Sequence, residues 1–126
     1  MLKLIADHME DGFLDNIIDM FKHDKSLYPL LGDLLADERS RVRIGVVALV
    51  ETLQEDDKEN VVKAIPYIAK LLKDPNPTIR GDAAYLLGII GHRDALKFLN
   101  EAVFDHNELV RNTILESIEE LEQIHR

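Results

Sequence analysis

The sequence predicts an all-α fold in which about three helix pairs stack side by side behind an N-terminal helical cap. Three observations support this prediction. One short pattern occurs three times, apolar residues recur with helical spacing around each copy, and sustained period-two alternation is absent. Repeats of this length are typical of stacked helical units rather than of a single-core enzyme.

The recurring pattern is an Asp followed six residues later by an Arg. Its three copies are Asp37 to Arg43, Asp74 to Arg80 and Asp105 to Arg111. The first two copies are offset by 37 residues, and the second and third by 31. We therefore expect one domain over residues 1–126, with repeats at 26–54, 60–91 and 94–125.

Residues 1–25 match the repeat pattern poorly and are interpreted as a degenerate unit that caps one end of the stack. Leu2, Ile5 and Met9 predict one short helix, which Gly12 ends. A strongly amphipathic helix is expected to follow from Phe13.

The segment before each Asp predicts the first helix of each repeat, with one apolar stripe. Pro29 and Pro66 occupy the same repeat position, eight residues before the Asp. Because proline lacks an N–H donor, we expect it to bend or break the first turn of these helices. The third repeat has Lys97 at this position, so a straighter helix is expected there.

The segment after each Asp predicts the second helix of each repeat. Asn76 before Pro77 is a typical start signal, Asn107 is its counterpart in the third repeat, and Gly91 is a plausible stop. The expected buried positions are Val42, Ile79, Val110, Val46, Ala83, Ile114, Val50, Leu87, Ile118, Leu53, Ile90 and Leu121. Six extra residues around Glu55 to Asn60 are expected to form a longer surface turn.

A proline, an Asp eight residues later and a Val-Arg or Ile-Arg pair after that resemble the HEAT repeat. The run from Ile79 to Gly88 is similar to the short HEAT-like repeats first named for phycobilisome lyases. The resemblance covers about residues 27–122 and implies a right-handed α-α superhelix. It also implies a structural ladder in which Asp37, Asp74, Asp105, Arg43, Arg80 and Arg111 bond neighbouring repeats to one another. The physical logic agrees, because an Arg beside a buried stripe needs a carboxylate partner.

Composition excludes several classes of partner and site. The net charge of −9 argues against nucleic acid and against anionic membranes, because both need a basic face. The absence of Cys excludes disulfides, thiolate zinc sites and cysteine catalysis. Because the sequence shows neither a signal-peptide pattern nor a stretch long enough to span a membrane, a cytoplasmic soluble protein is expected.

No catalytic, cofactor-binding or metal site is predicted, and the chain is expected not to be an enzyme. Deoxyhypusine hydroxylase, also built from HEAT-like repeats, places His-Glu pairs just after the repeat Arg to hold iron. The corresponding positions here are Ile44-Gly45, Gly81-Asp82 and Asn112-Thr113, and the chain contains no His-Glu pair. Asp19 and His23 could share one helix face, which we interpret as a solvated face or weak ion pair.

The remaining prediction is a binding surface on the second helices, which would line the concave side of the stack. The expected partner-binding residues are Tyr85, Ile44, Glu51, Asp82, Glu116 and Glu119. Gly81 and Gly88 beside Tyr85 would leave a shallow slot, and the acidic face favours a basic or amphipathic segment of another protein. The alternative for this surface is a merely solvated face. The alternatives for the protein are a regulatory or accessory subunit of an enzyme, such as a lyase-like chaperone, or a fragment of a longer repeat protein, and self-association is possible.

Overall fold

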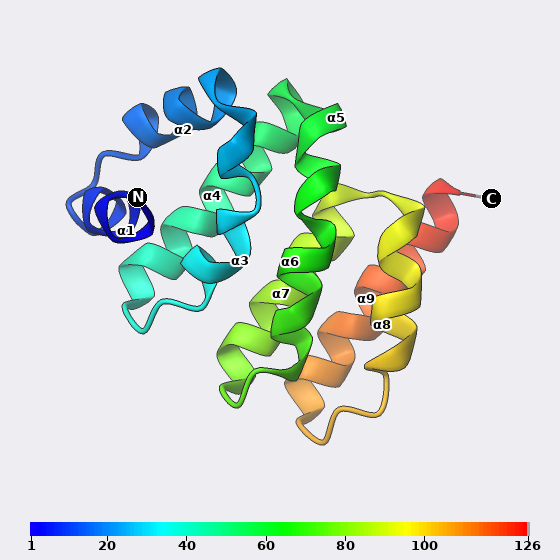
Figure 1. Ribbon diagram of the computed structural model, residues 1–126. Helices are drawn as coiled ribbons and strands as arrows, with labels where there is room; N and C mark the ends of the chain where they lie inside the picture. Colours follow the sequence, from blue (N-terminus) through cyan, green and yellow to red (C-terminus); the bar gives the residue numbers. More distant parts are fainter. Residues whose placement is uncertain (126) are drawn as a thin grey trace.

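The computed structural model describes residues 1–125, which form an α-α solenoid without any strand in that range. Figure 1 shows two layers of helices that extend to one side of an N-terminal pair. The N-terminal pair is α1 (Leu2–Glu10) and α2 (Leu14–His23). The first-helix layer contains α3 (Leu30–Leu35), α6 (Ile65–Ala69) and α8 (Leu96–Glu101). The second-helix layer contains α4 (Ser40–Asp56), α7 (Pro77–Ile90) and α9 (Glu108–Ile124). The predicted fold class is confirmed.

The N-terminal pair packs against α4. Gly12 has a φ of 90° between α1 and α2, and Phe13 is the N-cap of α2. Met9 lies directly on Gly45 of α4, where an added β-carbon would overlap the flexible methionine side chain. Glycine at this position therefore lets the cap approach the first repeat closely.

The first helices are assembled from short pieces. A 3₁₀-helical turn precedes the α-helix in every repeat: η1 (Lys25–Leu27), η2 (Val62–Ala64) and η4 (Arg93–Ala95). Another, η3 (Lys70–Lys73), follows α6. Pro29 is the N-cap of α3, and Pro66 lies in the first turn of α6. Because the repeat with Lys97 also begins with a 3₁₀ turn, this geometry does not depend on proline.

The second helices of the last two repeats begin after the predicted N-caps, and α7 ends at the predicted glycine. The side-chain oxygen of Asn76 accepts the N–H of Thr78 at 2.9 Å, and that of Asn107 accepts the N–H of Val110 at 3.1 Å. Gly91 ends α7 with a φ of 71°. All twelve positions predicted to be buried are at most 8% exposed, so the predicted apolar stripe is confirmed.

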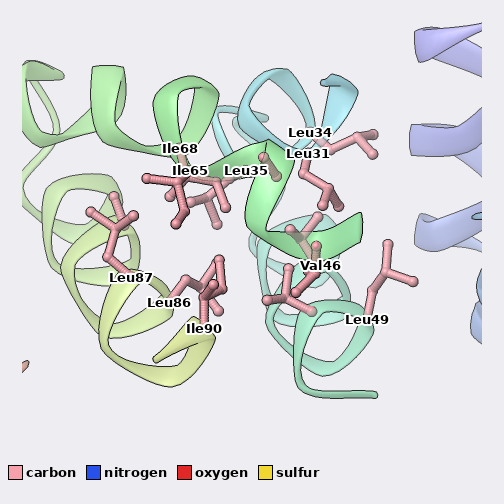
Figure 2. Packing of buried hydrophobic residues seen from close by; sticks show 14 of the residues in the cluster. Leu31, Leu34, Leu35, Val46, Leu49, Ile65, Ile68, Leu86, Leu87 and Ile90 are labelled. Carbon is pink, nitrogen blue, oxygen red and sulfur yellow. The ribbon is translucent and has the colours of Figure 1, made fainter. Parts of the chain in front are cut away.

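The core lies between the two layers and continues from repeat to repeat. Figure 2 shows aliphatic side chains of α3 and α4 meeting those of α6 and α7. The labelled residues are Leu31, Leu34, Leu35, Val46, Leu49, Ile65, Ile68, Leu86, Leu87 and Ile90. Truncation of one such leucine to alanine typically costs about 2–5 kcal/mol. Stability therefore depends on burial between repeats.

The extra residues after the first repeat are helical, so the prediction of a long surface turn is wrong. α4 continues to Asp56, α5 (Lys58–Val61) begins almost at once, and Asp57 alone separates them. The Asp57 carboxylate accepts hydrogen bonds from Lys25 Nζ and Tyr28 Oη at 2.5 Å each. These bonds, against the opposing effect of burial, lower the pKa of Asp57 to about 2. The junction between α4 and α5 is thus hydrogen-bonded to residues at the start of the first repeat.

Candidate functional site

The recurring Asp and Arg close the turn within each repeat. Each Asp carboxylate accepts the N–H of the residue two positions on, at 2.8–2.9 Å. Nη1 of the Arg donates to the main-chain oxygen of the same Asp at 2.8–2.9 Å, in the pairs Arg43 with Asp37, Arg80 with Asp74 and Arg111 with Asp105. Main-chain carbonyl groups left free where the first helix ends thereby gain donors.

One of these arginines also joins two repeats. Nε and Nη2 of Arg80 donate to the two carboxylate oxygens of Asp105 at 2.8 and 3.3 Å, and both side chains are only 7% exposed. Burial raises the pKa of Asp105, but hydrogen bonds from Arg80 and the Asn107 N–H outweigh it and the net pKa is lowered. This bidentate pair holds α7 against the turn before α9.

The predicted ladder of Asp–Arg bonds between neighbouring repeats is wrong at the preceding junction, between the first and second repeats. Among residues 1–125, no carboxylate lies within 4.0 Å of the Arg43 guanidinium, so Asp74 and Arg43 stay apart. Asp37 instead pairs with Arg39 at 3.0 Å, and Arg39 reaches Asp7 of the cap at 3.0 Å. Arg39 lies outside the repeat pattern, which is why the sequence did not point to it.

A groove of about 480 Å³ lies between α7 and α9 on the second-helix layer. Its principal walls, which define the α7–α9 groove, are Gly81, Asp82 and Tyr85 of α7 and Leu109, Thr113 and Glu116 of α9. Tyr85 is 45% exposed and Leu109 is 77% exposed. Together they present apolar surface beside hydroxyl and carboxylate groups.

The charges that line the α7–α9 groove are all negative. They belong to Asp82 and Glu116, and no Lys, Arg or His is among its lining residues. Burial raises the pKa of the half-buried Asp82 carboxyl, an effect that the charge of Arg43 partly offsets. A cationic side chain from another molecule would relieve this unfavourable burial.

The structure brings three of the predicted partner-binding residues together, since Tyr85, Asp82 and Glu116 share the groove. Ile44, which is 70% exposed, and Glu51 lie on α4 outside it, and Glu119 is exposed on α9 outside it. Sequence reasoning missed Leu109 and Thr113. The available signal was a leucine outside the buried stripe of its helix.

Gly88 does not line the slot, and that part of the prediction is wrong. It is buried beneath Ser117 of α9, and an added β-carbon would lie 2.6 Å from the serine Oγ. The Ser117 hydroxyl donates to the main-chain oxygen of Ala84 at 2.8 Å. Gly81, by contrast, has open space within 4 Å of an added β-carbon. Gly88 therefore allows α7 and α9 to pack closely, whereas Gly81 leaves open space in the groove.

The Asp19–His23 pair on α2 is a contact between exposed side chains. His23 Nδ1 lies 2.8 Å from the main-chain oxygen of Asp19 and 3.6 Å from its carboxylate, with both side chains exposed. Across residues 1–125, no group of three or more His, Cys, Asp or Glu side chains is placed to hold a metal ion. In the same range, no helix has the length and apolar character needed to cross a membrane.

The family described as HEAT repeats matches residues 29–119, which is more than half of the chain. The chain belongs to the HEAT-repeat family. HEAT repeats are commonly protein-interaction scaffolds and are generally non-catalytic. The finer similarity to phycobilisome-lyase-type repeats stays a prediction. Comparison with curated proteins gave no match.

Proposed function

We propose that this HEAT-repeat protein is a non-enzymatic interaction module that binds a basic or amphipathic segment of another protein in the α7–α9 groove. The observation that carries the proposal is the pairing of exposed Tyr85 and Leu109 with two carboxylates in a groove lined by no cation. Tyrosine is a favoured anchor at interfaces because it combines apolar area with a hydroxyl.

An amphipathic helix is the ligand that best fits this combination. Its apolar face would cover Tyr85 and Leu109, and its Lys or Arg residues would pair with Asp82 and Glu116. The net charge of −9 would attract such a segment from a distance and raise its association rate.

The groove is also suited to binding because its walls are fixed before a partner arrives. The Arg80–Asp105 pair and the Ser117–Ala84 hydrogen bond join α7 to the third repeat. A preformed groove loses little conformational entropy when it binds.

The test uses peptides selected from a random display library against the wild-type protein, followed by affinity measurement with fluorescence anisotropy. We expect selected peptides to be rich in Lys or Arg with an apolar stripe. Tyr85→Ala and Glu116→Lys should each weaken binding by about tenfold or more.

Two matched variants control this experiment. Tyr67→Ala removes an equally large ring that is 39% exposed on the first-helix layer, and Glu122→Lys reverses an exposed charge of α9 outside the groove. Both should keep wild-type affinity. Equal losses in the groove and control variants, with circular dichroism unchanged, would contradict the proposal.

A further inference from the structure

A second hollow, of about 510 Å³, lies on the first-helix layer between α6–η3 and α8. Its apolar surface comes from Ala69, Leu72, Phe98 and Ala102. Phe104 stands at its edge with 93% of its surface exposed. This α6–α8 hollow shares no lining residue with the α7–α9 groove.

The α6–α8 junction differs from the preceding α3–α6 junction at the repeat position of a glycine. At the preceding junction, Gly32 of α3 lies against the main chain of Tyr67, where an added β-carbon would clash with the carbonyl oxygen. Ala69 occupies the repeat position of Gly32, and Phe98 occupies that of Tyr67. A β-carbon at this position is incompatible with a main-chain contact as close as that between Gly32 and Tyr67.

The charge of this hollow differs from that of the rest of the molecule. Lys70 and Lys73 line it, and within the described part of the chain neither ammonium group has a carboxylate within 4.0 Å. Glu101 is the one lining carboxylate left without a cation in that part of the chain, because Asp105 is held by Arg80. The free charges therefore sum to +1 on a chain of net charge −9.

We propose that the α6–α8 hollow binds a small amphipathic carboxylate, a medium-chain alkyl or aryl-alkyl monoanion. Its apolar chain would lie on Leu72 and Phe98, and its carboxylate would pair with Lys70 and Lys73. The volume falls within the usual range of small-molecule sites, about 300–1,000 Å³, and more than half of the lining residues are apolar. The exposed ring of Phe104 would bury apolar surface if it packed on the bound chain.

The test is a titration of ¹⁵N-labelled protein with decanoate below its micelle-forming concentration, followed by amide chemical shifts. We expect saturable shifts confined to residues 66–73 and 98–105. The double variant Lys70→Glu, Lys73→Glu should bind decanoate at least tenfold more weakly. Lys63→Glu, at an exposed position of the same layer outside the hollow, should bind like the wild type.

Ligand charge and available space give independent checks. Decyltrimethylammonium, with the same chain length and the opposite charge, should bind at least tenfold more weakly than decanoate. Ala102→Leu places more side chain in the half-buried wall of the hollow and should abolish saturable binding while the helical circular dichroism spectrum is kept. The proposal is overturned if shifts fail to saturate, if they map to the α7–α9 groove, or if the double lysine variant binds as well as Lys63→Glu.

Discussion

Ser117 of α9 packs on Gly88 of α7 so closely that a β-carbon added to the glycine would lie 2.6 Å from the serine Oγ and 2.9 Å from its Cβ. The serine hydroxyl meanwhile donates to the main-chain oxygen of Ala84, one turn earlier on α7. The small side chains on both helices bring the second and third repeats into close contact. Glu51 takes the place of Gly88 on α4 and is exposed there, so the first two repeats have no equivalent contact.

Gly88→Ala should destabilise the protein by about 1–3 kcal/mol, since neither helix can yield without disturbing the packing around Ser117. Gly81→Ala is the matched control, because its added β-carbon meets no atom within 4 Å. That substitution should stabilise α7 by roughly 0.5–1 kcal/mol through helix propensity. Urea denaturation measures the free energy of unfolding of both variants. Equal effects of the two substitutions would contradict the close packing of Ser117 on Gly88.

Arg80→Ala should lower the free energy of unfolding by about 3–5 kcal/mol, because it leaves the Asp105 carboxylate buried without its partner. Arg43→Ala should cost distinctly less, since the Arg43 guanidinium donates to carbonyl oxygens and has no carboxylate within 4.0 Å among residues 1–125. Thermal and urea unfolding compare the two variants. If Arg43→Ala lowers the free energy of unfolding as much as Arg80→Ala does, the Arg80–Asp105 pair makes no particular contribution to stability.

Acidification should destabilise the junction at Asp57. Its pKa is about 2 in the folded protein and about 3.9 in an unfolded chain, so the unfolded state binds the proton more readily. The stabilisation is present above about pH 4 and is lost as the pH falls toward 2. Urea unfolding across this range should show a shallower pH dependence for Asp57→Asn than for the wild type. Parallel curves for the two proteins would refute the assignment.

Asp82→Asn should have opposite effects on stability and on binding. Because burial raises the pKa of Asp82, its charged form is unfavourable in the folded protein at neutral pH, and removing the charge should raise the melting temperature. In the wild type, this stability gain should appear instead as the pH falls through the raised pKa. The same substitution should weaken the basic peptides selected on the α7–α9 groove by roughly tenfold. A variant that binds these peptides with full affinity would remove Asp82 from the proposed interface.

Periodicity was enough to predict the helices because burial of one stripe per helix is a local signal. The stripe from Val42 to Leu53 and its two counterparts are buried as expected, and Asn76, Asn107 and Gly91 mark helix ends. Local signals did not show that the residues around Asp57 are helical, because that geometry depends on contacts with Lys25 and Tyr28 some 30 positions earlier.

For the candidate site, composition and spacing predicted an acidic second-helix face with Tyr85 on it. They could not show that Tyr85, Asp82 and Glu116 share one groove while Ile44, Glu51 and Glu119 lie outside it. Which positions face each other across neighbouring repeats depends on how closely the helices approach. That approach is decided by single small residues, such as Gly88 beneath Ser117.

The sequence by itself determined the repeat, its helix pairs and the buried stripe, because each follows from interactions within about ten residues of the chain. Only the tertiary structure decided where the repeats separate. Gly32 allows α3 and α6 to touch, whereas a hollow lies between α6 and α8, where Ala69 takes the repeat position of Gly32. The closeness of a helix contact depends on which side chains lie opposite each other in space, and that pairing is set by the whole stack and not by any one helix.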